Sequence, residues 1–406
     1  MEEKIIRREK IEEILENLYL MVFAAYIAFF FLGTTMFQIT WPEHFYTDLY
    51  TALTGFILVR LAYSKRCKIQ DIVFILGLYV LFEMAFKRNG YEEYIYLLVL
   101  MIGAKDISFR KIIKVYTAMI LVLLLGTVIC SLTGHVENLS YIQEGRRTRY
   151  AFGINYPTDF SAHIFYLILC WGFLRGKRIT YIELGVFGLL GGVVYWFCDA
   201  RLNTICILGS AVTFAVHKCL ENSAEKKGKS YHMHRGISAL LMGSGTICAA
   251  VMIWLTMLYS PDNAVISFLD RALSSRLRLG KKGIDIFGFT LWGQDIPMIG
   301  LGSTTEDVDY YFFLDSSYLY ILLQFGLLML IVLLFVWLCI GIKSYRNHQW
   351  VLLWIIALVA VQCMVEHHMV SIAYNPFWLA LLADLSIKGT TRKSRRLEDE
   401  NTMERL

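Results

Sequence analysis

Charged residues are scarce in this sequence. Of its 406 residues, 18% are Asp, Glu, Lys or Arg, whereas 57% are apolar. This is too little polar surface to cover a soluble globule of this size. A soluble enzyme is therefore excluded.

Several familiar patterns are also missing. The nine cysteines include no CxxC pair and no metal-ligand spacing, so we interpret them as small buried apolar side chains and predict no metal site. The glycines after residue 280 form no phosphate-binding GxGxxG motif and are interpreted as turn formers. No cleavable signal peptide follows the charged N-terminus, so the first apolar block should remain as a helix. The net charge is only +5 and forms no continuous basic stripe, so nucleic acid is not an expected partner.

The apolar residues form blocks long enough to cross a bilayer as helices, and short charged segments separate the blocks. We expect an all-α polytopic membrane protein with about 12 transmembrane helices. The expected spans are 18–38, 46–63, 70–86, 91–104, 113–132, 157–174, 181–198, 203–217, 236–258, 317–341, 349–365 and 371–387.

Positive charge sets the expected orientation. With the N-terminus inside, 27 of the 39 Lys and Arg residues lie in inner segments and 11 in outer ones, while Arg60 lies within a span. Because positive charge resists translocation, both termini should be cytoplasmic. We therefore expect three parts: a cytoplasmic N-terminal segment (1–17), a transmembrane domain (18–387) and a cytoplasmic basic tail (388–406). The N-terminal segment is either an amphipathic helix on the inner membrane surface or a solvated extension of the first span.

Two outer segments, 133–156 and 259–316, are the longest irregular parts of the expected fold. All five prolines fall in outer loops or at the outer ends of spans. Binding and catalytic residues concentrate in loops of this kind. We therefore expect function at the outer face.

Arginines cluster in these segments and in one short turn. The candidates are Arg149, Arg201, Arg271, Arg276 and Arg278. The planar guanidinium group matches the oxygens of a diphosphate or an acidic sugar, although any one surface arginine could equally contact lipid headgroups. Arg201 and Asp199 lie in a bare turn between two apolar spans, where ionisable groups are costly unless they pair or face a wet cavity. They form either a functional site or a structural ion pair.

Apolar spacing predicts one amphipathic surface helix from Ala264 to about Gly280. At 100° per residue, Arg278 would lie about 20° from Arg271, whereas Arg276 would point about 140° away. A single straight helix cannot aim all three side chains at one phosphate.

Candidate proton acceptors are few. Asp159 and His163 are four residues apart at the start of the sixth expected span, so they share a helix face. They form either an oriented base or a helix cap beside a packed histidine. The Glu-His-His run at 366–368 is similarly ambiguous, and neither group has zinc-site spacing. Asp315 begins the tenth expected span.

Several longer motifs resemble one known family. The similar segments are 149–153 (RYAFG), 156–158 (YPT), 199–201 (DAR), 273–280 (LSSRLRLG), 291–294 (LWGQ) and 314–326 (LDSSYLYILLQFG). In these segments the sequence resembles the Wzy-type polymerases of capsular and exopolysaccharide repeat units in Gram-positive bacteria. The chain departs from the commoner asparagine-rich version of the sixth-span motif, because it has Pro157-Thr158-Asp159 there.

The resemblance implies a C-type glycosyltransferase-like fold and a metal-independent enzyme without a cofactor, related to O-antigen ligases. Its substrates would be undecaprenyl-diphosphate-linked oligosaccharide and the growing glycan, at the outer leaflet of the bacterial cytoplasmic membrane. Membrane lipids, a flippase and a chain-length regulator are the implied partners. Such a reaction needs groups that stabilise charge on the leaving diphosphate, and Arg149, Arg201 and Arg276 are the residues carried over by resemblance.

These expectations assign roles to ten residues. The expected catalytic residues are Arg201, Arg276, His163, Asp159 and Asp315, the last three as proton acceptors in descending order. The expected substrate-binding residues are Arg149, Arg271, Arg278, Asp199 and Tyr318. Two alternatives stay open: O-antigen-ligase-like transfer to another acceptor, and a flippase for the same lipid-linked oligosaccharide. A missing internal repeat and the long segment 259–316 argue against the flippase.

Overall fold

The computed structural model describes residues 2–63, 69–84, 93–142, 147–304 and 310–386, so the expected tail at 388–406 lies outside the described residues. The helices are α1 (Glu2–Leu32), α2 (Phe45–Tyr63), α3 (Ile69–Phe82), α4 (Glu93–Gly103), α5 (Phe109–Leu132), α6 (Pro157–Arg175), α7 (Tyr181–Val193), α8 (Arg201–Lys226), α9 (Arg235–Met242), α10 (Ser244–Met257), α11 (Ala264–Ala272), α12 (Arg276–Phe287), α13 (Ser317–Tyr320), α14 (Gly326–Arg346) and α15 (Trp350–Gln362). Shorter elements are the strands β1 (Ser140–Tyr141) and β2 (Arg149–Tyr150), the 3-10 segments η2 (Gly176–Arg178) and η5 (Pro376–Leu381), and the π-helical segments η3 (Val194–Cys198) and η4 (Ile321–Phe325).

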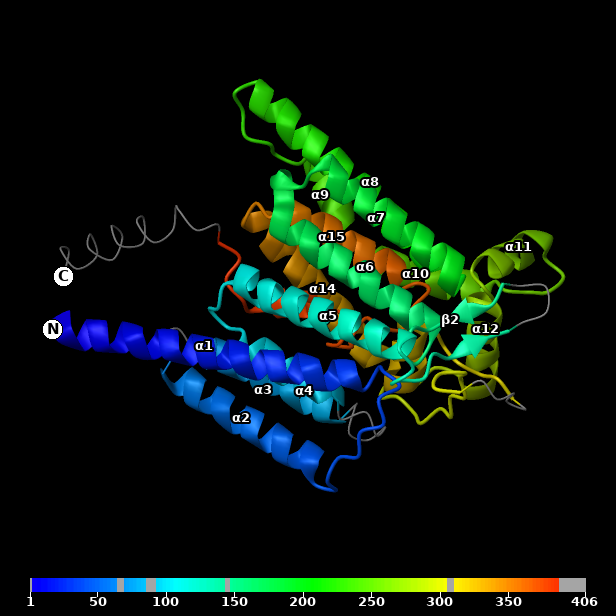
Figure 1. The fold of residues 1–406 in the computed structure, drawn as a ribbon, viewed down its shortest axis with the longest axis horizontal. Coiled ribbons are helices and arrows are strands. Elements are labelled where there is room, and N and C mark those ends of the chain that lie inside the picture. The colour runs from blue at the N-terminus through cyan, green and yellow to red at the C-terminus, as the bar shows by residue number, and fades with distance from the viewer. Residues whose placement is uncertain (1, 64–68, 85–92, 143–146, 305–309, 387–406) are drawn as a thin grey trace.

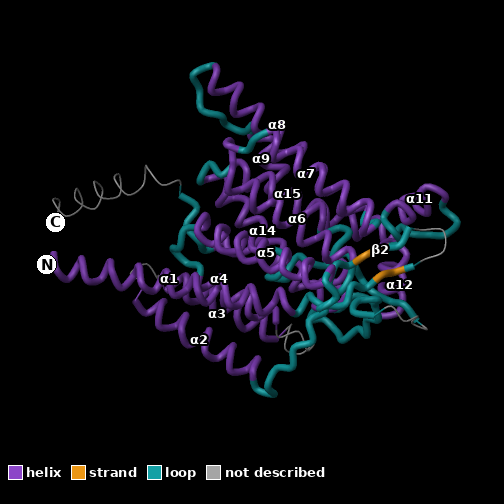
Figure 2. Tube along the Cα trace, viewed as in Figure 1, coloured by secondary structure: helices purple, strands orange, loops and turns teal. Residues whose placement is uncertain are grey.

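The helices form one elongated bundle. Figure 1 shows α5, α6, α14 and α15 in its middle, with α2 along one flank and α8 along the other. Figure 2 shows that strand structure is confined to one small hairpin near an end of the bundle. Large side chains such as Tyr116, Trp337 and Trp378 are less than 2% exposed and fill the core. The described chain is therefore nearly all helix.

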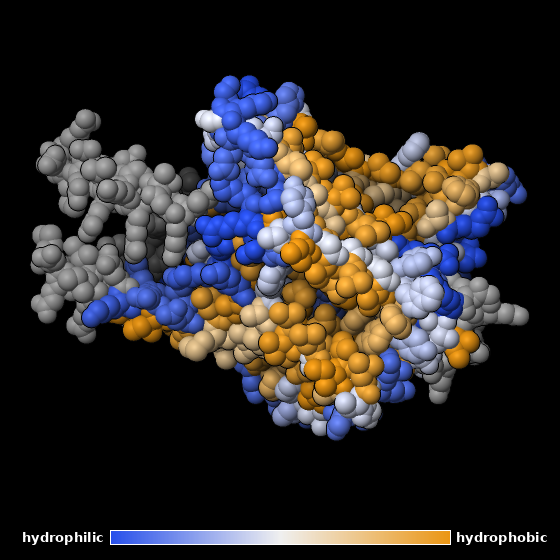
Figure 3. Space-filling view, turned by 45° about the horizontal axis from the view of Figure 1, so that its top comes forward, coloured by the Kyte–Doolittle hydropathy of each residue, from blue (hydrophilic) through white to orange (hydrophobic). Residues whose placement is uncertain are grey.

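The outside of the bundle is apolar. Figure 3 shows a broad apolar band across the visible face, with hydrophilic residues towards the two ends. Exposed fractions reach 81% for Ile182 and 68% for Leu189. Among the described residues, five helices are long and apolar enough to cross a membrane, and six if the bent pair α9 and α10 counts as one span. This is the pattern of a multi-pass membrane protein.

The expectation of about twelve transmembrane helices is wrong. The apolar helices α4 and α15 have only 11 and 13 residues. The twelfth expected span, 371–387, contains turns and the 3-10 segment η5 in its described part instead of an α-helix. Apolar blocks that are surrounded by protein need not be full-length helices, because neighbouring groups can satisfy their backbone. Counting blocks therefore overestimated the number of spans.

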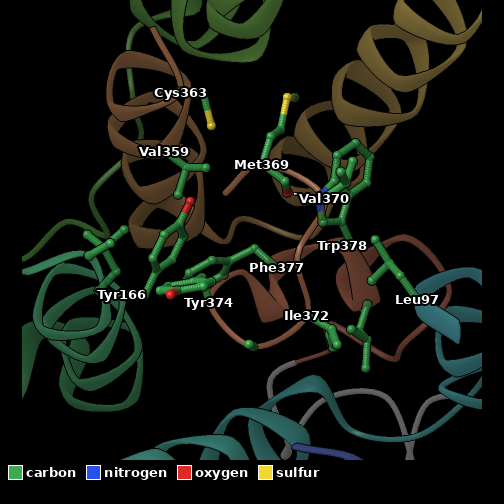
Figure 4. Packing of buried hydrophobic residues seen from close by; sticks show 14 of the residues in the cluster. Leu97, Tyr166, Val359, Cys363, Met369, Val370, Ile372, Tyr374, Phe377 and Trp378 are labelled. Atoms are coloured by element: carbon green, nitrogen blue, oxygen red, sulfur yellow. Dashed lines mark hydrogen bonds between the residues drawn. The ribbon is translucent and has the colours of Figure 1, made fainter. Parts of the chain in front are cut away.

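Residues 363–386, here called the final stretch, run through the core without an α-helix. Figure 4 shows part of it packed among side chains of other elements. The Lys343 ammonium donates hydrogen bonds of 2.6 to 3.0 Å to three carbonyl oxygens within 380–383. Trp378 Nε1 donates to the Met369 carbonyl at 2.6 Å. Side chains thus replace the hydrogen bonds that a helix would supply.

At the N-terminus, α1 runs without interruption from Glu2 to Leu32. Residues 2–17 therefore extend the first apolar helix, and the expectation of a separate helix on the membrane surface is not supported.

The two segments expected to lie outside pack together at one end of the bundle, at the right in Figure 1, which we call the site end. Tyr141 donates a hydrogen bond to the Leu301 carbonyl at 2.8 Å, and the Ser303 amide donates to the Asn155 carbonyl at 2.9 Å. The segments that carry Arg149, Arg276 and Arg278 thereby meet at one cleft.

The single helix predicted for 264–280 is wrong, because the chain breaks between α11 and α12. Ser274 and Ser275 have φ values of 53° and 67°, a left-handed conformation that non-glycine residues adopt only where the surroundings enforce it. Asp270 supports the break, since its carbonyl accepts from the Ser275 amide at 2.8 Å and its carboxylate accepts from the Arg278 amide at 2.9 Å. The break changes which arginines can share a site.

Candidate functional site

A cleft of about 410 Å³ lies at the site end, where segments far apart in the sequence meet. It is lined by Arg149, Tyr156, Thr158, residues 199–203, residues 274–276, Arg278, Leu279, Leu301, Tyr311, Asp315 and Glu366. Six of the ten residues predicted from sequence are among these: Arg149, Asp199, Arg201, Arg276, Arg278 and Asp315. Arg271 is not; it is exposed at the end of α11.

Arg149 comes from β2 and is only 7% exposed. Its Nε donates to the Cys198 carbonyl at 3.0 Å, and Nη1 donates to the Tyr156 hydroxyl at 3.2 Å. The guanidinium group also lies over the Tyr156 ring, 5.1 Å from its centre. These contacts fix the plane of the group, which has more N–H donors than the two bonds use.

Arg276 is the first residue of α12, and its side chain is 11% exposed. Nη2 lies 3.3 Å from the Asp315 carboxylate, Nε donates to the Val365 carbonyl at 3.2 Å, and Nη1 donates to the Ser274 carbonyl at 3.0 Å. Three different segments therefore orient this guanidinium group. It is the most constrained charge in the cleft.

Arg201 is the first residue of α8, and it is more accessible, with a side chain 59% exposed. Its Nε donates to the Asp199 carboxylate at 3.2 Å. Asp199 has a left-handed φ of 44° and a side chain only 1% exposed. The ion pair considered from sequence is thus present, and both residues still line the cleft.

Three helices begin at the cleft. The first turns of α6, α8 and α12 contribute Thr158, Arg201 and Arg276 to its lining. In none of the three does the N-cap side chain accept a hydrogen bond from the helix, although in α12 the Asp270 carboxylate accepts from the Arg278 amide. Helix N-termini carry unsatisfied N–H groups and a partial positive charge, which together favour anions. The backbone thus adds to the attraction that the arginines provide.

Glu366 lies on the cleft lining just after the end of α15 and is 1% exposed. Its Oε1 accepts from Asn203 Nδ2 at 3.0 Å, whereas Oε2 has no hydrogen-bond partner among the described residues. Burial raises the pKa of Glu366 to about 8, although the positive charge of Arg276 opposes the shift. The sequence left its role open, but an acidic residue at the end of an apolar block is a signal that could have selected it.

Asn203 is a second cleft residue that the sequence did not single out. It is fully buried, and its amide nitrogen shares its two N–H donors among Glu366, Ser161 Oγ at 2.6 Å and the Thr158 carbonyl at 3.1 Å. It therefore ties α8 to the start of α6 and holds the Glu366 carboxyl in place.

Asp159 and His163, two of the three predicted proton acceptors, do not line the cleft. His163 is fully buried, its Nε2 lies 3.0 Å from Thr34 Oγ1, and its ring stacks on Tyr374 with centres 4.0 Å apart. Asp159 lies 3.3 Å from Nε2 of His368, whose ring stacks on the same tyrosine at 3.8 Å. The placement favours the packed-histidine interpretation.

One group of possible metal ligands comes together among the described residues. Asp159, His367 and His368 each offer a donor atom, and these atoms lie within 4.8 Å of one another. Burial lowers the pKa of His367 and His368 to about 4 and about 3, so both imidazoles are neutral at pH 7. The group could hold a metal ion, since Nε2 of His368, 3.3 Å from the Asp159 carboxylate, and Nδ1 of His367 have no hydrogen-bond partner among the described residues. From the sequence, Asp159 and the Glu-His-His run at 366–368 were considered separately, because Glu366 lies 207 positions after Asp159.

Tyr318 also lies away from the cleft. It is fully buried, and its hydroxyl donates to the Ala360 carbonyl at 2.8 Å, which joins α13 to α15. Its place is in the packing beneath the site.

The cleft as a whole combines several guanidinium groups, three helix N-termini and one buried carboxyl group. This arrangement suits a ligand with more than one negative charge, next to a group that exchanges a proton. In comparisons with known proteins, no family model, no curated protein and no solved structure matches the chain.

Proposed function

We propose that this protein is a polysaccharide polymerase that joins undecaprenyl-diphosphate-linked oligosaccharide repeat units at the outer face of the bacterial cytoplasmic membrane. The observation that carries the proposal is the convergence of four arginines and three helix N-termini on one cleft. Guanidinium groups match phosphate oxygens, and helix N-termini bind phosphate groups readily. The motifs that resemble Wzy-type polymerases supply most of these residues.

The charges of the cleft support a diphosphate. Its four arginines face three carboxyl groups, those of Asp199, Asp315 and Glu366. Because the pKa of Glu366 is raised to about 8, that carboxyl group is mostly neutral at pH 7. Even when Glu366 is ionised, as a proton acceptor must be, the arginines outnumber the carboxylates, and this excess of positive charge suits a negatively charged diphosphate.

The proposed reaction needs a proton acceptor and a charged leaving group. A hydroxyl oxygen of the incoming repeat unit attacks the anomeric carbon of the growing glycan, and the bond from that carbon to the diphosphate oxygen breaks. The bonding electrons leave with the diphosphate, where the arginines stabilise the developing charge. The hydroxyl proton passes to the ionised form of Glu366, which we prefer to His163 because Glu366 lines the cleft and His163 does not. Asp315 is less suited, since Arg276 already pairs with it.

The test uses the purified protein in detergent, where there is no membrane for a flippase to cross. Lipid-linked repeat units extracted from source cells that lack this gene should be lengthened, with release of undecaprenyl diphosphate. Arg276→Ala should abolish lengthening, while Arg271→Ala, an exposed arginine outside the cleft, should not.

Three other outcomes would contradict this function. Folded protein that moves the lipid between the leaflets of vesicles but never lengthens the glycan would be a flippase. Transfer of the glycan only to a different acceptor would indicate a ligase. A chelator should leave the rate unchanged, because arginines and not a metal ion meet the phosphate charge in this mechanism, and loss of activity reversed by added metal would refute metal independence.

A further inference from the structure

A second cavity, also of about 410 Å³, lies between α7 and α8. We call it the α7–α8 groove; it is lined by Gly188, Gly192, Tyr195, Arg201, Thr204, Ile205 and Leu208. Apart from Arg201 and Thr204, this lining is glycine, aliphatic or aromatic. Arg201 lines both the groove and the polar cleft. The two cavities therefore meet at a guanidinium group.

The glycines of α7 do two different things. Gly191 faces α8, where an added Cβ would come within 3.2 Å of Leu208, so its small size allows the two helices to approach. Around Gly188 and Gly192, in contrast, an added Cβ would meet nothing within 4 Å. Helix packing does not require glycine at these two positions. Their missing side chains leave the groove open.

The groove leads from the polar cleft to the apolar surface. Its lining on α8 runs from Arg201 to Leu208, which is about 10 Å along the helix at the usual rise per residue. Exposed apolar side chains continue around and beyond it: Leu189 is 68%, Ile205 66% and Val212 63% exposed. A ligand that fits both cavities must have a charged head and an apolar chain that can follow the groove towards the apolar surface.

We propose that the α7–α8 groove binds the polyprenyl chain of the lipid-linked donor, with Arg201 at the junction between the chain and its diphosphate. This inference rests on the proposed function. The occupant is a polyprenyl diphosphate and not a bilayer phospholipid, because four guanidinium groups and three helix N-termini around the adjoining cleft offer donors to more phosphate oxygens than one phosphate group presents. The groove thereby explains how a membrane lipid delivers its head group into a polar cleft.

Filling the groove should change the preference for chain length. Gly192→Leu and Gly188→Leu place a side chain in it, and Gly126→Leu on α5, where there is equally nothing within 4 Å, is the matched control. Repeat units on the natural long chain and on a single isoprene unit, which is too short to fill the groove, should be compared. We expect wild type and Gly126→Leu to have a lower KM for the long-chain substrate than for the short-chain one. In Gly192→Leu the ratio of the two KM values should fall at least tenfold. A tenfold change is on the order of what two methylene contacts contribute. An unchanged preference in both groove variants, at equal melting temperature, would overturn the inference.

A binding measurement separates this inference from the proposed function. A photoreactive undecaprenyl diphosphate without glycan should label peptides of α7 and α8 in wild type, less so in Gly192→Leu, and excess phosphatidylglycerol should not compete. If phosphatidylglycerol competes as well as undecaprenyl diphosphate, or if the label appears on other helices, the groove is not the polyprenyl site, even if glycans are lengthened. If the protein is labelled at the groove but never lengthens glycans, the proposed polymerase function is rejected and the proposed lipid site is retained.

Discussion

Arg276 and Arg201 both line the cleft, but their guanidinium groups are held differently. Arg276 is nearly buried and contacts three segments, whereas Arg201 is more than half exposed and makes one ion pair with Asp199. A buried, oriented guanidinium group acts through its geometry, and an exposed one acts largely through its charge. The same substitution should therefore have different effects at the two positions.

We predict that Arg276→Lys loses nearly as much polymerising activity as Arg276→Ala, on the order of 2 to 4 kcal/mol of transition-state stabilisation. Arg201→Lys should retain more activity than Arg201→Ala, and added salt should narrow that difference, because exposed charges are screened over about 10 Å. Glycan length distributions at equal expression and two salt concentrations would measure both effects. Near-normal chains from both alanine variants would remove these arginines from the site.

Glu366 should give the activity its pH dependence. The proposed acceptor must be ionised to take a proton, and burial raises the pKa of Glu366 to about 8. The charges of Arg276 and Arg149 favour ionisation, while those of Asp315 and Asp159 oppose it. We therefore predict that the rate rises between about pH 6 and pH 8 and levels off above the pKa.

Glu366→Gln should remove both the activity and this rise. Glu137→Gln, which changes an exposed acid outside the cleft, should keep the wild-type profile. If Glu366→Gln keeps the wild-type rate, or if the wild-type rate does not change with pH, another group must accept the hydroxyl proton.

At the scale of elements, interruptions of regular structure build the site. The break between α11 and α12 brings Arg276 and Arg278 to one cleft and leaves Arg271 outside it. The π-helical segment η3 ends at Cys198, directly before the turn that carries Asp199 and Arg201. π-Helical turns and left-handed serines are uncommon and concentrate at functional sites. A continuous helix at either place would have scattered the charges.

The final stretch depends on Lys343 of α14, and this dependence is testable. Lys343→Met keeps the apolar stem but removes the donor to three carbonyl oxygens. Unsatisfied buried carbonyls cost about 1 to 3 kcal/mol each, so the free energy of unfolding should fall by about 3 kcal/mol or more. Melting of the detergent-solubilised protein, with the exposed Lys227→Met as control, would measure the loss. Equal melting temperatures would show that these hydrogen bonds contribute little.

At the scale of the whole molecule, sequence reasoning identified a nearly all-helical membrane protein and all four arginines of the cleft. Scarce charge and apolar blocks were sufficient for the first; the second came from the clustering of arginines in segments expected to lie outside and, for Arg201, from the cost of a charge near the bilayer. The number of spans could not be predicted, because an apolar block has the same composition whether lipid or protein surrounds it. Glu366 and Asn203 could not be paired either, since 163 residues separate them and only the fold joins them.

Orientation in the membrane remains a prediction from charge. Lys229→Cys, in a background without native cysteines, should stay unlabelled by an impermeant maleimide in intact cells, whereas Asp262→Cys should be labelled. Lys229 is preferable to the neighbouring Gly228, whose φ of 66° disfavours a side chain. Labelling of Lys229→Cys from outside would reverse the orientation and place the cleft on the wrong side for the proposed reaction.

The final stretch also has a consequence for biosynthesis. A nascent segment can enter lipid alone only if it satisfies its own backbone, as a helix does. Backbone carbonyls of residues 363–386 instead accept hydrogen bonds from side chains of other helices. The donors are Lys343 of α14 and Tyr116 of α5, whose hydroxyl donates to the Ala373 carbonyl at 2.9 Å. We therefore expect the translocon to insert the long helices first, and this stretch to enter the bilayer only as the assembled bundle receives it.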